Sequence, residues 1–389
     1  MKILLLHNAY QLRGGEDSVL EQESKLLQKN GICFETYVID NRHITRPINK
    51  IIAAIGACFS VRSYFLTRRL ISTQKPTLVH VHNFFPLLSP SVFYACKHEH
   101  VPVILTLHNY RIICPTALLM FDGVIRETSV HNGPWWALSH RVYKNSYVGT
   151  FFLCLMIWLH RIVGTWQTKV DTFIALTDFG KSKFIEAGLP PSKIVVKPNF
   201  VDMPFPTVTK KDKLLFLGRL SEEKGVRVLL DAILLDGGIG KFISIAGEGP
   251  LSNQVAISDA TYLGLLNARD VSTQMQSALA LLMPSIWYEG FPMALVEAYA
   301  NGLPVIASRI GALAELVEDG VTGLLFEPGN SGDLAAKMVW ALEHPDEIRR
   351  MGKAARARYE ALYTPERNYE QLMSIYRAAI NSNTIKKQK

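Results

Sequence analysis

Two carboxylates eight residues apart, Glu289 and Glu297, stand in the segment YEGFPMALVEAYANGLPVIAS (288–308). Gly-Phe-Pro follows the first, and an apolar helical pattern surrounds the second. Carboxylates so placed around the start of a helix could bind different ends of one extended ligand. The alternative is that Glu289 caps the helix and Glu297 is an ordinary solvated side chain.

The residues between these glutamates predict a loop followed by a helix start. They come after an apolar run, ALALLMPS (278–285), which has the composition of a buried strand. Pro292 suits the first position of a helix, where no backbone N–H is needed. Free N–H groups around Phe291 and Met293 would then favour polar or anionic ligand atoms.

A pair of cations, Arg219 and Lys224, lies in LGRLSEEKG (217–225), at the end of another predicted strand. Two fixed cations at a strand-to-helix turn can neutralise a diphosphate without a metal ion. The competing interpretation is that both cations form plain surface ion pairs with Glu222 and Glu223.

The first half of the chain offers two weaker candidates. Gly14 and Gly15 follow the first predicted strand and open a helix, so that backbone can approach a ligand closely. His108, in LTLHNYRIICP (105–115), ends a strand, and ligand-binding residues often stand where a strand passes into a loop. Paired glycines and single histidines are, however, also common in ordinary turns and strands.

Strand-like apolar runs alternate with helical stretches, which predicts an α/β fold with doubly wound parallel sheets. Helices are expected over 16–29, over 88–98 and from about Asp178. The strands expected in the first half are KILLLHN, ICFETYVID, TLVHVHN, VPVILTLHN, DTFIALTD and KIVVKPN. Those expected in the second half are KLLFLGRL, KFISIAG, TYLGLL, ALALLMPS and LPVIAS.

A proline-rich segment without periodicity, 198–212, predicts a linker between two Rossmann-like domains. The predicted domains are 1–197 and 213–363, and a last segment, 364–389, follows them. Thr364-Pro365-Glu366 predicts the start of a final helix that runs to about Ile380, crosses back to the first domain and ends in a frayed tail. Ligands bind outside the carboxyl ends of the strands in such sheets, so a central cleft between the domains is expected.

The distribution of charge and of cysteines limits which kinds of ligand and site the sequence predicts. The net charge is +8, but residues 1–200 carry 22 basic and 12 acidic residues (+10), whereas residues 201–389 carry 20 and 22 (−2). The five cysteines all lie in the first half without a C-x-x-C pair, which favours neither a zinc site nor a disulfide framework and is typical of the cytoplasm. MKILLLHNAY predicts a first strand rather than a signal peptide, and the apolar run 148–166 breaks too early to span a membrane.

Taken together, these motifs resemble the retaining glycosyltransferases of family 4, which have the GT-B fold. The resemblance extends from ILLLHNAYQLRGGED through VHVHNFFPLLSP and LHNYRIICP to GLPVIASRIGALAELVEDGVTGLLF. It implies two Rossmann-like domains and transfer of a sugar from a nucleotide-diphosphate sugar to a hydroxyl of a glycan or lipid-linked acceptor. Synthesis of a capsule, O-antigen or exopolysaccharide is the expected setting.

The resemblance also implies roles for individual residues. Glu297 would bind the ribose hydroxyls, and Glu289 would bind the hydroxyls of the sugar. Arg219 and Lys224 would hold the diphosphate, and His108 would touch the sugar near the reacting carbon. The backbone positions implied in donor binding are Gly14, Gly15, Gly290, Phe291, Pro292 and Met293.

No metal ion or other cofactor is expected. The chain has no D-x-D motif, and FDGVIRETSVHN (121–132) lacks the cysteines that some relatives carry after the ICP segment. In the expected mechanism the diphosphate leaves first and takes the proton of an acceptor hydroxyl that arrives on the same face. A covalent intermediate through Glu289 is the less favoured route.

Two other functional classes fit the sequence less well. IAGEGPLS (245–252) resembles a dinucleotide-binding loop, but it lacks the third glycine, and no acid ends the next strand. A non-catalytic nucleic-acid binder would explain the basic half but not the ligand-type residues of the acidic half, and no recognition module is visible. GGIGKF (237–242) resembles a P-loop but has no Ser or Thr after its lysine.

Basic and apolar residues alternate over 41–70, which predicts peripheral docking on an anionic membrane surface. The stretch 148–166 adds aromatic and apolar residues. The alternative is that both segments are ordinary helices packed on the sheet. The basic residues concerned are Arg42, Arg46, Lys50, Arg62, Arg68 and Arg69.

Overall fold

The computed structural model describes residues 1–9, 14–41, 47–203 and 212–388, with side chains over the same ranges except 47–51 and 385–388. The chain forms two compact units. Unit 1 comprises Met1–Phe121, Arg126–Pro198 and Asn368–Lys389, and unit 2 comprises Asp122–Ile125 and Asn199–Arg367.

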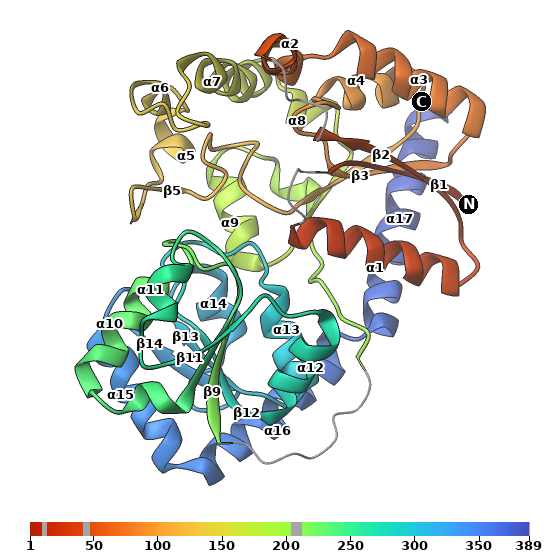
Figure 1. The fold of residues 1–389 in the computed structure, drawn as a ribbon. Coiled ribbons are helices and arrows are strands. Elements are labelled where there is room, and N and C mark those ends of the chain that lie inside the picture. Colours follow the sequence, from red (N-terminus) through yellow and green to blue (C-terminus); the bar gives the residue numbers. More distant parts are fainter. Residues whose placement is uncertain (10–13, 42–46, 204–211, 389) are drawn as a thin grey trace. The chain divides into compact units, whose positions relative to one another are not determined.

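Unit 1 contains a sheet of six parallel strands in the order β2-β1-β3-β4-β7-β8 (Figure 1). β3 is buried along its whole length and β1 along all but its two end residues, because helices cover both faces of the sheet. The edge strand β2 is exposed or half-buried throughout. The strands are Lys2–Ala9 (β1), Cys33–Asp40 (β2), Leu78–Asn83 (β3), Val103–Leu107 (β4), Thr172–Ala175 (β7) and Ile194–Val196 (β8).

The helices of unit 1 bury one face each. α1, for example, buries Val19, Leu20, Leu26 and Leu27, and also one charged residue, Glu23. The helices are Gly15–Lys29 (α1), Pro47–Cys58 (α2), Val61–Gln74 (α3), Ser91–His98 (α4), Thr128–Asn132 (α5), Trp136–Ser139 (α6), Tyr147–Ile162 (α7), Thr165–Thr168 (α8) and Asp178–Glu186 (α9), with a 3-10 turn at Pro191–Lys193 (η2).

Unit 2 contains a second sheet of six parallel strands, in the order β11-β10-β9-β12-β13-β14. Numbered within the unit, this is the Rossmann order 3-2-1-4-5-6. The strands are Lys213–Leu217 (β9), Ile243–Ala246 (β10), Thr261–Gly264 (β11), Ala278–Met283 (β12), Val305–Ser308 (β13) and Gly323–Phe326 (β14). The helices are Val226–Asp236 (α10), Ser252–Ala256 (α11), Ala268–Ser277 (α12), Met293–Ala300 (α13), Gly311–Leu316 (α14), Ser331–Glu343 (α15) and Pro345–Leu362 (α16), with a 3-10 turn at Ile239–Phe242 (η3).

The final helix, α17 (Pro365–Gln388), follows unit 2 in sequence but packs in unit 1. Its residues Leu372, Met373 and Tyr376 share a core with Ile3 and Leu5 of β1. The predicted start of this helix agrees with the structure, where Thr364 Oγ1 accepts from the N–H of Arg367 at 3.4 Å. The predicted end near Ile380 is wrong, since helical backbone continues to Gln388.

Other differences from the sequence prediction are local. β14 and the two-stranded ribbon of β5 (Met120–Phe121) and β6 (Val124–Ile125) were not predicted, because short strands carry too little pattern. α4 begins at Ser91 rather than at 88, because Ser89 has a φ of 58° and Pro90 is the N-cap. Of the helices in the described ranges, none is both long and apolar enough to cross a bilayer.

Candidate functional site

Polar side chains gather in each unit where the order of the strands reverses direction. This switch point lies between β1 and β3 in unit 1, and between β9 and β12 in unit 2. The loops after these strands diverge there, which leaves room for a ligand at the carboxyl edge of the sheet. The predicted residues Gly14 and Gly15 follow β1, Arg219 and Lys224 follow β9, and Glu289 follows β12.

In unit 2, Lys224 and Glu289 form an ion pair between the loops after β9 and β12. Lys224 Nζ donates to Glu289 Oε1 at 2.6 Å, and Ser285 Oγ donates to the same oxygen at 2.8 Å. The Lys224 ammonium also lies over the Trp287 ring, 5.5 Å from its centroid. Glu289 is only 4% exposed, so it is a buried carboxylate.

The two loops that carry this ion pair are fixed against each other. The N–H of Ile286 donates to the carbonyl of Glu223 at 3.0 Å. Gly225, the N-cap of α10, has a φ of 70°, and a Cβ there would lie 1.7 Å from the Pro284 carbonyl oxygen. Only glycine fits this approach, so the geometry of Lys224 relative to Glu289 is set by backbone packing.

The loop before α13 presents unused donors. The backbone N–H groups of Gly290 and Phe291 donate to no acceptor in the described part of the chain. α13 begins at Met293, and Pro292 is its N-cap rather than its first helical residue as predicted. No side chain caps α13, so the alternative that Glu289 is a helix cap is wrong.

Two further predicted residues have polar groups without partners. Glu297, in the second turn of α13, is half-buried, and burial raises the pKa of its carboxyl. Neither the Glu297 carboxylate nor the exposed Arg219 guanidinium contacts a polar partner among the residues that the structure describes. The predicted alternative of pairing with Glu222 and Glu223 is wrong, because Glu222 pairs with Arg227 and Glu223 accepts from Ser221.

The glycines that resembled a dinucleotide-binding loop have a packing role instead. A Cβ at Gly247 would lie 1.8 Å from the carbonyl oxygen of Gly218, and one at Gly249 would lie 2.4 Å from that of Leu220. The N–H of Leu220 also donates to the Glu248 carbonyl. These glycines therefore hold the loop after β10 against the loop after β9, which carries Arg219.

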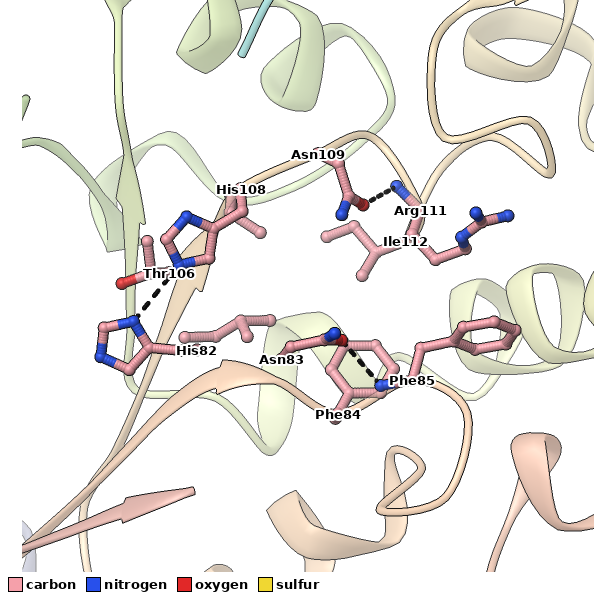
Figure 2. Close-up of a pocket in the computed structure, with 11 residues that line it drawn as sticks. His82, Asn83, Phe84, Phe85, Thr106, His108, Asn109, Arg111 and Ile112 are labelled. Carbon is pink, nitrogen blue, oxygen red and sulfur yellow. Dashed lines mark hydrogen bonds between the residues drawn. The ribbon is translucent and has the colours of Figure 1, made fainter. Parts of the chain in front are cut away.

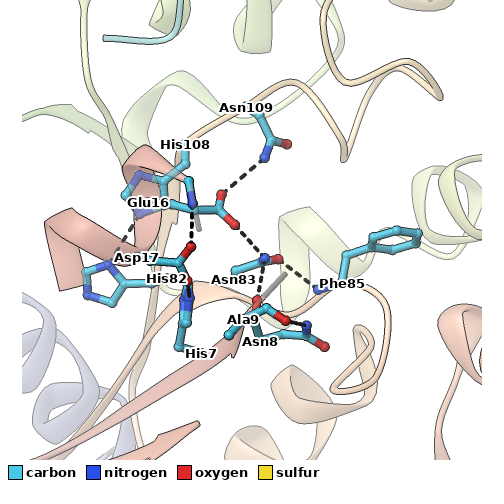
Figure 3. Close-up of polar contacts among 11 residues, drawn as sticks. His7, Asn8, Ala9, Glu16, Asp17, His82, Asn83, Phe85, His108 and Asn109 are labelled. Carbon is cyan, nitrogen blue, oxygen red and sulfur yellow. Dashed lines mark hydrogen bonds and ion pairs between the residues drawn. The ribbon is translucent and has the colours of Figure 1, made fainter. Parts of the chain in front are cut away.

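In unit 1, the predicted glycines open α1. The acids that follow them, Glu16 and Asp17, lie among the amides drawn in Figure 3. The N–H of Gly14 donates to Asp17 Oδ2 at 2.7 Å, and Asp17 Oδ1 lies 2.7 Å from His7 Nε2. A Cβ at Gly15 would meet no atom within 4 Å and its φ is ordinary, so packing among the described residues does not require glycine there.

Glu16 is an acid that the sequence did not single out. Its carboxyl accepts from Asn83 Nδ2 at 2.7 Å and from Asn109 Nδ2 at 3.4 Å, as Figure 3 shows. Burial, and next the neighbouring charge of Asp17, raise the pKa of Glu16 to about 8. Two amides from the ends of β3 and β4 thus hold a carboxyl group that is largely protonated near neutral pH.

The predicted His108 lines a pocket at the ends of β3 and β4 (Figure 2). Burial lowers the pKa of His108 to about 3, so its ring is neutral. The Arg111 guanidinium lies over the Phe85 ring, 5.1 Å from its centroid, and supplies the pocket with a cation. The other polar residues lining the pocket are His82, Asn83, Thr106 and Asn109.

Behind His108 lies a buried group of charged and imidazole side chains. Glu23 and Lys197 are each 1% exposed, and Lys197 Nζ donates to Glu23 Oε1 at 2.8 Å. His82 Nδ1 lies 3.3 Å from His108 Nε2. These residues were not predicted, although the sequence has two signals for them. One is a glutamate on the buried face of α1, and the other is the pair of histidines in the wholly buried strand LVHVHN.

Comparisons with known proteins agree with this architecture. Residues 202–358 match the family model Glycosyl transferases group 1, and residues 40–204 match that of Glycosyltransferase Family 4. A phosphatidyl-myo-inositol mannosyltransferase of Mycobacterium leprae is 31% identical over 297 residues, covering 68% of this chain and 76% of that protein. An uncharacterized glycosyltransferase of Methanocaldococcus jannaschii is 25% identical over 367 residues, covering 91% and 92%. Among solved structures, Anabaena HepE in complex with UDP matches with a TM-score of 0.68 at 19% identity, covering 97% of this chain and all (100%) of that one.

Proposed function

The chain belongs to glycosyltransferase family 4 and is a glycosyltransferase with the GT-B fold; we propose that it is a retaining enzyme. It transfers a sugar from a nucleotide-diphosphate sugar to a hydroxyl of a glycan or lipid-linked acceptor, in the assembly of a capsule, O-antigen or exopolysaccharide. The observation that carries the proposal is the Lys224–Glu289 ion pair, which joins the two predicted motifs at the switch point of unit 2.

Each unused polar group of unit 2 matches one part of the donor. The Glu297 carboxylate binds the ribose hydroxyls, and Arg219 with Lys224 binds the diphosphate. Glu289 Oε1 is taken by Lys224 and Ser285, so Oε2 is left to accept from a sugar hydroxyl. The N–H groups of Gly290 and Phe291 donate to the oxygens of the same ligand.

The reaction is a front-face substitution. The bond from the anomeric carbon to the diphosphate oxygen breaks, and positive charge develops on the sugar. The acceptor oxygen bonds to the anomeric carbon on the same face, and its proton moves to the departing phosphate oxygen. Arg219 and Lys224 stabilise the negative charge that grows on the diphosphate. Glu289 is buried and accepts from two donors. These contacts support a role in binding the sugar rather than nucleophilic attack on its anomeric carbon.

The experiment is a transfer assay preceded by a binding screen. Calorimetry with nucleoside diphosphates identifies the base, and UDP is the first to test because the similar Anabaena structure holds UDP. The matching nucleotide-sugar should then be consumed with release of the nucleoside diphosphate and with retention at the anomeric carbon. Inversion of that carbon would contradict the retaining mechanism, and a protein that binds none of these nucleotides would contradict the donor site.

We also propose that transfer has no strict requirement for a divalent metal. The support is the absence of a D-x-D motif and the presence of two cations for the diphosphate. Chelation should therefore leave the rate nearly unchanged. Loss of activity in chelator that manganese or magnesium restores would overturn this part of the proposal.

A second part of the proposal is docking on an anionic membrane. α7 exposes Phe151, Trp158 and Ile162, which recur at helical spacing, and α3 exposes Val61 and Phe65. Single exposed apolar residues are ordinary, but the concentration of aromatic residues on these helices is typical of an interfacial surface. The opposite face of α7 is buried in unit 1. This part of the segment therefore agrees with the alternative, in which it is an ordinary packed helix.

The cations of this surface are fewer than the sequence indicated. Arg62 and Arg69 are exposed, with no ion pair in the described ranges, whereas Arg68 pairs with Glu99. Arg42 and Arg46 lie outside the described residues, and the side chain of Lys50 is among those not described. The membrane variant is therefore Arg62→Gln with Arg69→Gln, without Arg68.

Vesicle sedimentation tests the docking. Binding should require anionic lipid, fall with added salt, and fall again in the Arg62→Gln/Arg69→Gln variant and in Phe65→Ser/Trp158→Ser. The matched control is Leu234→Ser/Leu235→Ser, which removes two exposed apolar side chains from α10 in unit 2. Equal binding to neutral vesicles, or an equal loss in the control, would contradict the proposed surface.

A further inference from the structure

His108 contacts a second histidine, which in turn faces a buried carboxylate. His108 Nε2 lies 3.3 Å from His82 Nδ1, with the two rings stacked (Figures 2 and 3). On the other side of the His82 ring, Nε2 lies 3.4 Å from Glu23 Oε2. The three side chains come from the end of β4, from β3 and from α1, so they connect the pocket to the core of unit 1.

Both imidazoles in this path carry one hydrogen each. Burial lowers the pKa of His82 well below its ordinary value, and burial also accounts for the low pKa of His108. For Glu23, burial acts to raise the pKa, but its neighbours, with Lys197 first among them, outweigh burial and hold the pKa below its ordinary value. The path therefore consists of two neutral rings and one carboxylate.

The position of each hydrogen follows from the partners. Lys197 Nζ occupies Glu23 Oε1, and it also donates to Asn368 Oδ1 at 3.1 Å. Glu23 Oε2 and His82 Nε2 are both fully buried, form no hydrogen bond in the described part of the chain, and face each other at 3.4 Å. A carboxylate oxygen can only accept, so His82 carries its hydrogen on Nε2, toward Glu23. Its Nδ1 then accepts, and His108 must donate to it from Nε2.

We propose that Glu23 and His82 are positioning residues that fix His108 as the Nε2–H tautomer, so that Nδ1 of His108 is a hydrogen-bond acceptor for a sugar hydroxyl. Nδ1 contacts no polar partner among the described residues and is not buried, so a ligand can reach it. The tautomer stands on the geometry alone. The identity of the ligand rests on the proposed function.

The orientation of His108 has a chemical consequence in that reaction. Positive charge develops on the sugar ring as the diphosphate leaves. A nitrogen lone pair directed at the sugar favours this charge, whereas an N–H group in the same place opposes it. Glu23 and His82 should therefore affect kcat more than the affinity for the donor in its ground state.

The group of Glu23, His80 and His82 could be taken for a metal site, since its ligand atoms lie within 4.8 Å of one another. Both ring nitrogens of His80 are, however, already engaged. His80 Nδ1 lies 2.8 Å from Tyr376 Oη, and His80 Nε2 lies 2.8 Å from Thr106 Oγ1. The Lys197 ammonium lies where a cation would neutralise Glu23, so this cluster is a hydrogen-bonded network.

Glu23→Gln is the decisive variant, because the structure dictates how the amide must turn. Lys197 can only donate, so the amide oxygen faces Lys197 and the amide NH₂ faces His82. His82 Nε2 must then accept, its Nδ1 must donate, and His108 changes to the Nδ1–H tautomer. The control is Tyr376→Phe, which removes a hydrogen bond to His80 from the same buried network and leaves the path to His108 intact.

The tautomers are read by long-range ¹H–¹⁵N correlation spectra of the ligand-free protein, with the His108 signal assigned from a His108→Gln spectrum. The wild-type protein and Tyr376→Phe should show Nε2–H at His108, and Glu23→Gln should show Nδ1–H. Turnover of Glu23→Gln should fall about 10- to 100-fold with KM nearly unchanged. Turnover of Tyr376→Phe should stay near that of the wild-type protein.

Several results would overturn the proposal. Nδ1–H at His108 in the wild-type protein would do so without any variant, so the test does not depend on Glu23→Gln folding. An unchanged His108 tautomer in Glu23→Gln, or a changed tautomer with unchanged turnover, would do so as well. If wild-type protein transfers no sugar, the proposed function fails while the tautomer is still decided by the spectra.

Discussion

Both units have polar groups at the switch point of their sheets, but the two sets of groups differ in burial and in pairing. In unit 1 the pair Lys197–Glu23 is almost wholly buried, and the histidines beside it are engaged with one another. In unit 2 the ammonium of Lys224 is partly exposed, Arg219 is exposed, and Glu297 has no polar partner in the described part of the chain. The charges of unit 1 therefore pair with one another in the core, whereas unit 2 has polar groups that the proposed function assigns to the donor.

Removing one lysine from each unit tests whether the two ion pairs have different roles. Lys197→Met leaves the Glu23 charge buried and unpaired, so it should lower the free energy of unfolding of unit 1 by about 3–5 kcal/mol. Lys224→Met should cost less than Lys197→Met but remove most of the activity, because the Lys224 ammonium is partly exposed and Glu289 keeps its hydrogen bond from Ser285. Hydrogen exchange of amides in β1, β3, β9 and β12 measures each unit separately. Equal destabilisation by both variants would show that the two pairs have the same role.

Arg219→Ala tests the ligand-binding character of unit 2 directly. The variant removes a cation from the diphosphate as negative charge grows on it, so turnover should fall about 10²- to 10³-fold while stability is unchanged. Arg227→Ala is the matched control, because Arg227 lies on the adjoining helix and, among the described residues, pairs only with the exposed Glu222. The comparison of kcat at saturating donor decides between them, and a similar loss in both variants would contradict the role of Arg219.

The two glutamates of unit 2 should separate binding from turnover. Glu297→Ala removes the acceptor for the ribose and should weaken nucleotide affinity, whereas Glu289→Ala should mainly lower kcat. Each loss should be about ten- to a hundredfold, the range for hydrogen bonds to a charged group. Calorimetry with the nucleotide and steady-state kinetics measure the two effects. Full activity and unchanged affinity in both variants would rule out the assignment.

The smallest expected effect is a pH dependence of unit 1. The raised pKa of Glu16 means that its neutral form stabilises the fold fully below the ordinary pKa of 4.5, and that this contribution is lost as the pH rises to about 8. Glu16→Gln should therefore be more stable than the wild-type protein by about 1–3 kcal/mol at pH 8.5, and nearly equal to it at about pH 5. A constant difference across this range, measured by denaturant unfolding, would contradict the assigned protonation.

Most strands of the two sheets and the candidate site residues of unit 2 were predictable from the sequence. Strands such as KILLLHN are continuous apolar runs, and that pattern survives in any buried parallel sheet. β14 was not predicted, because its four residues, GLLF, are too few to show a hydrophobic periodicity. Its first residue is fixed by packing, since a Cβ at Gly323 would lie 2.1 Å from the Val305 carbonyl oxygen. Such an approach between two strands has no signal in a single sequence.

The contacts within the network of unit 1 could not be predicted for a related reason, although the buried positions of Glu23 and the two histidines had a signal. Glu23 and Lys197 are 174 positions apart and meet only because α1 and the end of β8 pack in the same unit. A glutamate on a helix and a lysine after a strand are ordinary surface residues by composition. The positions of Lys224 and Glu289 were predictable, because each follows a strand of one sheet, but the burial of Glu289 was not.

The return of the chain to unit 1 in α17 also sets an order of events during synthesis. Tyr376 and Leu372 share a core with Ile3 and Leu5, so unit 1 cannot close until α17 has been made. Unit 2 needs no residue beyond Arg367. Nascent chains fold as their domains emerge, so unit 2 can finish while unit 1, begun earlier, still waits with part of its sheet uncovered. A chain that ends after Arg367 should therefore contain a protease-resistant unit 2 and a protease-sensitive unit 1, the reverse of the order in which the two are encoded.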